Sequence, residues 1–160
     1  MKAWHKIAVL SVMGFSLGFG VIYAFFGAKP PPTELGDTTG KPTDLDWSKL
    51  RELDVTTGKA SDFLKSADGK YAKMPGFMIP LEDNSQEISE FLLVPSPMAC
   101  IHVPAPPPNQ IVHVKMASGR RTKPSYGPVW VYGRIRITEV THAYGKASFE
   151  MTGEKTEPYN

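Results

Sequence analysis

The clearest alternation of apolar and polar positions in the chain lies between Pro128 and Val140. From Val129 to Ile137 every second residue is apolar or glycine, and the residues between them are aromatic or basic, such as Trp130 and Arg134. Side chains along a β-strand point to opposite faces in turn, so a period of two predicts a strand with one buried face. Gly133, in the middle of this segment, predicts a bulge or a bend of the sheet.

Shorter apolar runs predict the other strands of a sheet: residues 73–81, 90–94, 111–116 and 147–152. Pro75 and Pro80 lack an amide donor, so the first of these segments is predicted to be an edge strand. Apolar residues at positions 47, 50 and 53 predict one or two turns of helix behind an Asp46 N-cap. Five or six strands with a glycine-bent long strand indicate a mainly β protein. We expect a small OB-like β-barrel, with a sandwich as the alternative.

The longest apolar stretch of the chain stands near its N-terminus. Residues 7–26 contain no charge, and a helix of twenty residues spans about 30 Å, the thickness of the hydrocarbon core of a bilayer. We expect a single transmembrane helix that is not cleaved, because Phe25 and Phe26 stand where a cleavage site needs a small residue. Lys2 and Lys6 precede the run, which predicts a cytoplasmic N-terminus and a chain that continues into the periplasm.

The composition beyond this run completes the predicted organisation. Residues 1–28 are expected to be the uncleaved membrane anchor, residues 29–46 a linker rich in proline, glycine and threonine, and residues 47–160 the β domain. Pro30–Pro32 is a stiff polyproline segment, which would hold the domain away from the bilayer. We therefore expect a single-pass protein of the inner (cytoplasmic) membrane whose C-terminal domain faces the periplasm.

The balance of charges excludes one large class of partners. The formal net charge is +2, and Lys2 and Lys6 are the only charged residues among the first 28, so the remaining chain carries sixteen basic and sixteen acidic residues. General nucleic-acid binding needs a clear basic excess, so we expect no nucleic-acid partner. The chain has one cysteine, which cannot form an internal disulfide, so the β domain must be stable without one.

The only cysteine, Cys100, lies in a stretch that cannot be regular structure. Six prolines fall between positions 95 and 108, and each fixes φ and removes a backbone donor. The stretch also holds His102 and carries no charge, unlike an ordinary proline-rich linker. We predict a rigid loop between the strands at 90–94 and 111–116 that presents a thiol and an imidazole together.

These two side chains are candidate metal ligands. In an extended backbone Met98, Cys100 and His102 would share one side of the loop. Thiolate and imidazole are the usual ligands of zinc, and an added thioether also suits Cu(I). His113 on the returning strand is the expected third ligand, and His142 a fourth. The alternative is that Cys100 is a buried small hydrophobe and that His102 bonds to loop backbone.

Catalysis by this thiol is not expected. His102 could lower the pKa of Cys100 and make a nucleophile, but no acidic residue lies between positions 91 and 138 to orient a histidine base, and there is no CxxC motif. We therefore predict a non-enzymatic protein. Asn109 and Gln110 close the loop, and their amides can satisfy backbone groups where prolines have removed donors.

The same stretch carries a family resemblance. The sequence CIHVPAPPPNQIVHV at 100–114, with GFMIPLE at 76–82 and PVWVYG at 128–133, resembles the DUF3299 family of bacterial envelope proteins. Its core is the pattern C-I-H-x-P-x-P-P-x-N-Q. The resemblance implies an envelope context, because members often accompany ABC-transporter components, some of them in zinc-responsive gene clusters. It implies no reaction, and it does not extend to a ligand role for Met98.

Together these observations predict a membrane-anchored periplasmic accessory protein of an envelope transport system, such as an ABC transporter. It would bind zinc, or copper, through Cys100, His102 and His113. The alternative is a structural or adaptor subunit of a membrane protein complex that binds no metal. Its proline loop would then be a rigid docking element, in which Met98, Asn109 and Gln110 contact the partner.

Overall fold

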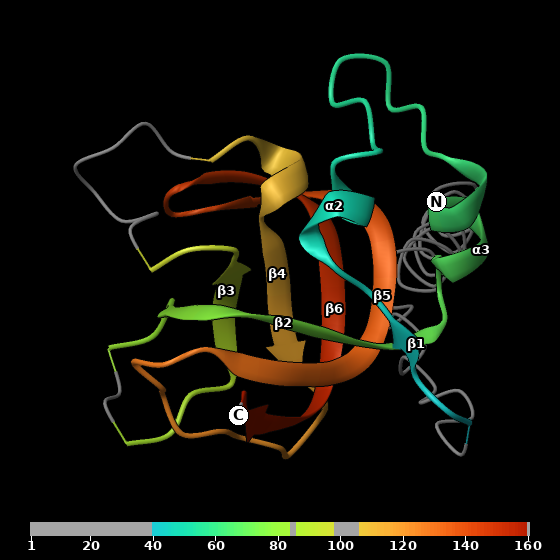
Figure 1. The fold of residues 1–160 in the computed structure, drawn as a ribbon. Coiled ribbons are helices and arrows are strands. Elements are labelled where there is room, and N and C mark those ends of the chain that lie inside the picture. The colour runs from blue at the N-terminus through green and yellow to red at the C-terminus, as the bar shows by residue number, and fades with distance from the viewer. Residues whose placement is uncertain (1–39, 84–85, 98–105, 160) are drawn as a thin grey trace, which may run out of the picture. The chain divides into compact units, whose positions relative to one another are not determined.

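The computed structural model describes residues 40–83, 86–97 and 106–159 (Figure 1). The predicted anchor at residues 1–28 and the candidate residues Met98, Cys100 and His102 lie outside these ranges. Among the described residues, no helix is long and apolar enough to cross a membrane.

The described chain consists mainly of β-strands. They are β1 (Thr43–Asp44), β2 (Tyr71–Pro80), β3 (Glu90–Val94), β4 (Val112–Met116), β5 (Val129–His142) and β6 (Gly145–Pro158). The described helices are short: α2 (Trp47–Leu50), α3 (Asp62–Ala67) and the 3₁₀ turn η1 (Pro108–Gln110). Asp46 and Ser61 are the N-caps of α2 and α3, and each side chain accepts a hydrogen bond from a backbone amide of the first turn. The predicted mainly β architecture is confirmed.

All six strands join one sheet in the order β1-β2-β3-β4-β6-β5. Strand β2 also pairs with β5, so the ladder that starts at β2 and passes through β3, β4, β6 and β5 returns to β2. The β1–β2 and β4–β6 pairs are parallel, and the others are antiparallel. Figure 1 shows β5 and β6 curving around the other strands, with α2 and η1 at one end of the sheet.

The period-two segment forms β5, as predicted. Val129, Val131 and Ile135 point into the core, while Trp130 is half-buried on the other face. The predicted irregularity at Gly133 is also confirmed, because the β5–β6 register shifts between Tyr132 and Gly133. A Cβ at Gly133 would stand 2.3 Å from the carbonyl oxygen of Thr152, so only glycine lets the two backbones approach this closely.

The prediction that residues 73–81 form an edge strand was wrong. Strand β2 pairs with β5 through residues 71–76, with β1 through 72–73 and with β3 through 77–80. Pro75 is tolerated because its carbonyl oxygen accepts a hydrogen bond from Trp47 Nε1 at 2.8 Å. The nitrogen and carbonyl of one strand residue point to the same edge, so the missing donor of Pro75 faces a position that the Trp47 side chain fills.

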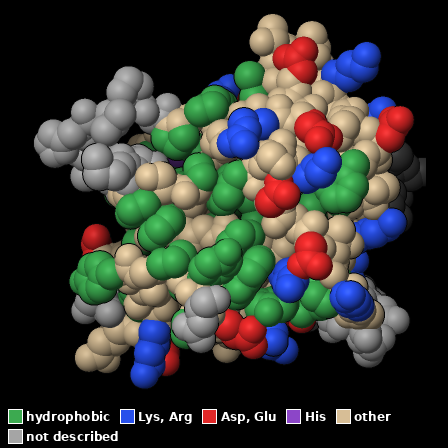
Figure 2. Space-filling model, viewed as in Figure 1, with side chains coloured by type: hydrophobic (Ala, Val, Ile, Leu, Met, Phe, Trp, Pro, Cys, Tyr) green, Lys and Arg blue, Asp and Glu red, His purple; other side chains and the backbone are tan. Residues whose placement is uncertain are grey.

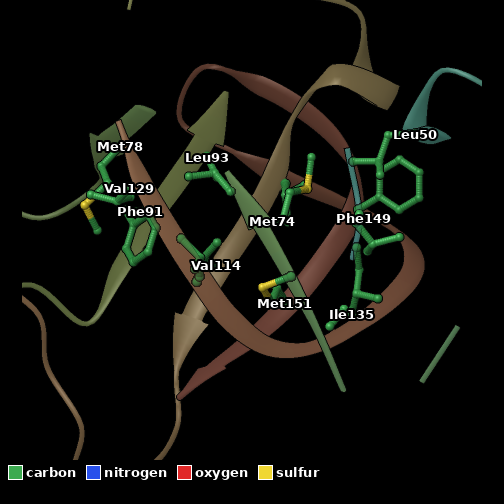
Figure 3. Close-up of a cluster of buried hydrophobic side chains, with 14 of the residues drawn as sticks. Leu50, Met74, Met78, Phe91, Leu93, Val114, Val129, Ile135, Phe149 and Met151 are labelled. Carbon is green, nitrogen blue, oxygen red and sulfur yellow. The ribbon is translucent and has the colours of Figure 1, made fainter. Parts of the chain in front are cut away.

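Apolar side chains lie on both faces of β3, whereas β4 turns Val112, Val114 and Met116 to one face and His113 and Lys115 to the other. The core cluster contains most of the largest fully buried side chains, among them Phe91, Phe149, Leu93, Met74 and Met151 (Figure 3). A second cluster forms on the opposite face of the same strands: Leu92, Val94, Ile111 and Ala147 are buried there, with Phe77, Ile79 and Leu81 packed against them. We call this second cluster the outer apolar layer. The candidate site lies on the same face of the sheet.

Candidate functional site

His113 is a histidine in the middle of β4 that faces outward from the core. Its neighbours Val112 and Val114 point into the core cluster, so alternation along the strand turns His113 to the face of the outer apolar layer. The residue is nevertheless only 2% exposed. Its imidazole is therefore a polar group held away from water.

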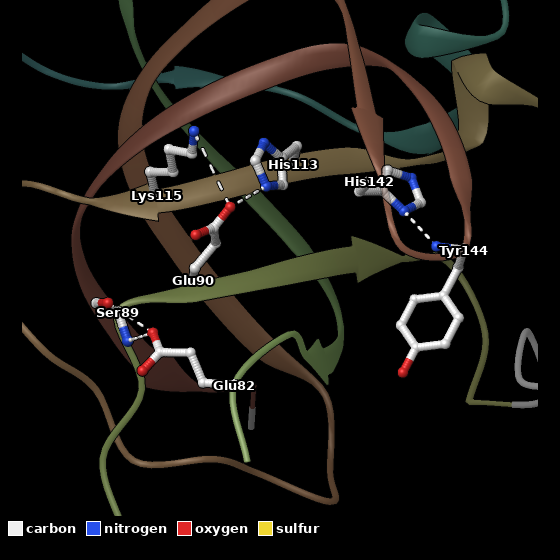
Figure 4. Close-up of polar contacts among 7 residues, drawn as sticks. All are labelled: Glu82, Ser89, Glu90, His113, Lys115, His142 and Tyr144. Atoms are coloured by element: carbon white, nitrogen blue, oxygen red, sulfur yellow. Dashed lines mark hydrogen bonds and ion pairs between the residues drawn. The ribbon is translucent and has the colours of Figure 1, made fainter. Parts of the chain in front are cut away.

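Glu90, at the start of β3, supplies the partner of this imidazole. The strand register sets His113 opposite Leu92 and Glu90 opposite Lys115, so Glu90 reaches His113 diagonally across the two strands. The Nε2 atom of His113 lies 2.7 Å from Glu90 Oε1 (Figure 4). Lys115 Nζ lies 4.0 Å from the same oxygen. Since an ionised carboxylate only accepts, Nε2 of His113 carries the proton of this hydrogen bond.

The other nitrogen of His113, Nδ1, has no hydrogen-bond partner in the part of the chain that the structure describes. Among the described residues Nδ1 is buried and receives no hydrogen bond. A buried polar atom without a partner costs about 1–3 kcal/mol, so such atoms are uncommon in native structures. As far as the described residues go, the lone pair on Nδ1 is available to a proton donor or a metal ion.

His142, at the end of β5, is the second imidazole in this region. Its ring centroid lies 6.3 Å from that of His113, with 19° between the planes. The backbone N–H of Tyr144 donates to Nδ1 of His142 at 3.2 Å, while Nε2 is buried and lacks a partner among the described residues. Burial lowers the pKa of His142 below its usual value, and the nearby His113 lowers it further. The ring is therefore neutral at neutral pH.

The two imidazoles do not form a ready-made pair of ligands. Figure 4 shows both nitrogens of His113 on the side of the ring that faces away from His142. Within the described ranges, no group of three or more His, Cys, Asp and Glu residues is arranged to hold a metal ion. His113 thus offers one lone pair, and any further ligands must come from elsewhere in the chain or from a partner.

The predicted residues of the loop end have internal partners. Asn109 Nδ2 donates to the carbonyl oxygen of Leu53 at 2.8 Å. Gln110 Nε2 donates to the carbonyl oxygen of Trp47 at 3.3 Å, and Gln110 Oε1 accepts from Arg51 Nη1 at 3.1 Å. These bonds fasten η1 to the segment around α2. They hold the backbone of η1 in place, directly before β4 and His113.

Sequence reasoning missed Glu90 as a member of the site. It stands at the first position of the strand predicted at 90–94, and no role in the site was expected for it. The signal that identifies it is the combination of strand and register: Glu90 and His113 share a face only because β3 and β4 pair as they do. An acidic residue at the first position of a strand that is otherwise apolar on both faces is a modest hint of the same role.

The fold and the site define a class: a mainly β protein that buries an oriented histidine on the outer face of its sheet. Over residues 45–158 the chain matches the family described as protein of unknown function (DUF3299), and it belongs to that family. It is also similar to a crystal structure of a DUF3299 family protein from Pseudomonas aeruginosa PAO1, with 33% sequence identity and a TM-score of 0.60. That similarity covers 76% of this chain and 98% of the other. No curated protein matches the chain.

Proposed function

We propose that this protein is a membrane-anchored, periplasm-facing accessory component of an envelope transport system. In this role it binds zinc, or alternatively copper, through Cys100, His102 and His113. The observation that carries the proposal is the state of His113: Nδ1 is buried without a partner among the described residues, while Glu90 holds Nε2.

This arrangement is typical of a metal-binding histidine. Such a residue almost always donates its second ring N–H to a carboxylate, a carbonyl or water, which fixes the ring and raises its basicity. Glu90 is in position to do this for His113. Thiolate and imidazole complete the usual ligand set of zinc, and Cys100 and His102 supply these groups thirteen and eleven residues earlier in the sequence.

The proposed setting follows from the sequence. Residues 1–28 would anchor the chain in the inner membrane, residues 29–46 would form the linker, and the β domain would face the periplasm. The family's association with ABC-transporter components supports an inner-membrane transport complex as the partner. The zero formal net charge of residues 29–160 supports the expectation that nucleic acid is not a partner.

We further infer that the domain is a five-stranded barrel of the OB type. The antiparallel meander β2–β3–β4, the parallel β4–β6 pair and the return of β5 to β2 support this assignment. A sandwich, in which two sheets face each other without a continuous ring of pairings, is the less favoured alternative.

Metal analysis of the purified full-length protein tests the proposal. After dialysis against a weak chelator, we expect the wild-type protein to retain one zinc or copper ion per chain. Cys100→Ser should lose most of this metal because the thiolate is the strongest ligand, and His102→Ala should lose part of it. Wild-type protein that retains neither metal, with a thiol that reacts only after denaturation, would refute metal binding.

A hollow on the surface favours the adaptor alternative. It has a volume of about 420 Å³ and is lined by apolar and proline residues that include Phe77, Ile79, Pro97 and Pro124, beside the fully exposed Tyr126. Figure 2 shows hydrophobic side chains gathered on this face of the molecule, over β2 and β3. Metal-free protein that still co-purifies with a membrane complex, and loses it when Tyr126 is changed to Ser, would support the adaptor instead.

A further inference from the structure

We propose that β2, along its edge at residues 77–80, binds an extended apolar segment of a partner protein that carries a basic residue. The segment would join the sheet as a short additional strand and fill the hollow beside this edge. We call this part of β2 the open edge. The inference goes beyond the proposed function and does not depend on metal binding, because none of its residues belongs to the metal site.

The open edge results from the different reach of two paired strands. Strand β5 pairs with β2 only as far as Val129, which lies opposite Gly76. Strand β2 continues to Pro80 and pairs over its last four residues with β3, on its other side. The chain bends at residues 126–127, directly before β5. Among the described residues, therefore, no strand covers the β5 side of β2 beyond Gly76.

The backbone of Met78 points out of the open edge. Leu81, directly after β2, donates its N–H to the carbonyl oxygen of Glu90 at 3.2 Å. Hydrogen bonds alternate along an antiparallel strand, so residues 77 and 79 also bond toward β3, and Met78 offers its N–H and carbonyl to the opposite side. Pro80 points the same way but has no N–H, so it limits the added strand to a short one.

The hollow beside the open edge has a volume of about 420 Å³ and an apolar lining. Phe77 and Ile79 line it from β2, and Pro124 and the fully exposed Tyr126 line it from the segment before β5. A residue that pairs with Met78 would turn its two neighbours toward the face of Phe77 and Ile79. The occupant should therefore be apolar at two positions that are separated by one residue.

The charges around the hollow indicate the chemistry of one end of the occupant. Among the described residues that line it, Glu82 and Asp83 carry a charge, and both are acidic. Glu82 is held by Ser89 and Arg121, whereas the Asp83 side chain is exposed. Both acids follow Pro80, so the negative charge lies at one end of the open edge. A lysine or arginine of the occupant would complement it, which favours a peptide over a lipid chain.

Amide hydrogen exchange of the full-length protein tests the open edge before a ligand is added. We expect the N–H of Met78 to exchange faster than that of Ile79, which lies opposite Leu92 and bonds toward β3. An N–H of Met78 that is as strongly protected as that of Ile79 would show that this edge is already paired, and it would overturn the proposal.

A synthetic peptide tests strand addition. The probe is a short blocked peptide of alternating valine and threonine with a lysine at each end. We expect it to shift the NMR signal of the Met78 amide and to slow its exchange. N-methyl groups on the threonines remove the donors that face β2 and should abolish binding, whereas N-methyl groups on the valines should weaken it less. Equal loss with both, or no response of Met78 to the unmodified peptide, would overturn the proposal.

Variants of the full-length protein test the hollow and its charge with the same peptide. Tyr126→Ala should weaken binding by about fivefold or more, as expected for an aromatic residue at the centre of a contact. Asp83→Asn should weaken it by up to about fivefold, and a peptide that ends in glutamine should not detect this change. Tyr144→Ala is the matched control, because Tyr144 is exposed but does not line the hollow.

Unchanged affinity of Tyr126→Ala, or equal loss in Tyr144→Ala, would overturn binding in the hollow. The Met78 signal should not depend on protein concentration in the absence of peptide. A signal that shifts with protein concentration would identify a second copy of this chain as the occupant, and it would overturn the assignment to a partner protein.

Discussion

The imidazole of His113 has a cost for the fold as well as a role in the candidate site. Its Nδ1 atom is buried without a partner among the described residues, although apolar side chains occupy the same face of β3 and β4. A protein selected only for stability would place a leucine or a methionine here, because these side chains fill a similar volume and need no hydrogen bond. The proposed metal binding would account for a histidine at this position.

We therefore predict that His113→Leu makes the metal-free protein more stable, by about 1 kcal/mol, because the buried lone pair is removed and the space is filled. Glu90 loses its partner, but its side chain is 39% exposed and water can solvate it. His113→Ala should instead be destabilising, because it leaves a cavity. Urea unfolding measures both changes. A leucine variant less stable than the wild type would show that His113 contributes to stability in the native fold.

The residues of the candidate site could be predicted from the sequence only in part. His113 could be named from the sequence, because it lies on the strand that returns from the loop with Cys100 and His102. Glu90 is 23 residues away, and only the register of β3 against β4 brings its carboxylate to the imidazole. The surroundings of His113 and His142 differ, because a carboxylate contacts one ring and a backbone amide the other, and a sequence pattern carries no information about either contact.

The connection between β2 and β3 is fixed by a carboxylate. Glu82 Oε1 accepts from both the backbone N–H and the hydroxyl of Ser89, each at 2.6 Å, and Glu82 Oε2 accepts from Arg121 at 2.9 Å. The bonds from Ser89, together with Arg121, lower the pKa of Glu82 to about 2. Arg121 belongs to the segment between β4 and β5, so this carboxylate holds two connections together.

The lowered pKa predicts how stability depends on pH. A carboxyl with a depressed pKa stabilises the folded state above its unfolded pKa, and this contribution is lost as the pH falls toward the folded value. Glu82→Gln should therefore lower the urea midpoint at pH 7, and its difference from the wild type should shrink between about pH 5 and pH 2. Asp83→Asn, which removes a charge from the exposed neighbour, is the control. A difference that does not depend on pH would contradict the assignment.

The strands differ in how well their positions could be predicted from the sequence. Strand β5 was predictable because one face is apolar at every second position. Strand β6 was predicted only over residues 147–152, yet it extends from Gly145 to Pro158. Its second half is polar, and it is a strand because it pairs with β5 along its whole length. The error over β2 has a similar cause, since a tryptophan side chain fills the position that Pro75 leaves without a donor.

The pairing of β1 bears on where the β domain begins in the chain. Strand β1 pairs with Ala72 and Lys73 of β2, and the following residue, Leu45, is 3% exposed. These residues fall within the segment that the sequence analysis assigned to the linker. The structure shows them joined to the sheet, and the family match also begins at residue 45.

We predict that a fragment of residues 40–160 is folded and more stable than a fragment of residues 46–160. The shorter fragment loses β1 and the buried Leu45 side chain, whose burial contributes about 1.5–3 kcal/mol. Both should give β-type circular dichroism spectra with little helix, and thermal unfolding should show the difference. A mainly helical spectrum, or equal stability of the two fragments, would show that this description of the domain is wrong.

The return of the strand ladder to β2 has a consequence for how the protein is made. Strand β4 pairs in parallel with β6, and β5 pairs with β6 as far as Pro158, so the ladder cannot be completed until residue 158 is available. A chain that emerges from the ribosome or a translocon with its N-terminus first must therefore remain unfolded, with its apolar strands exposed, until synthesis or export is almost finished. Such a chain should depend on chaperones until it is complete, and it should be more sensitive to truncation near residue 158 than to changes in its surface loops.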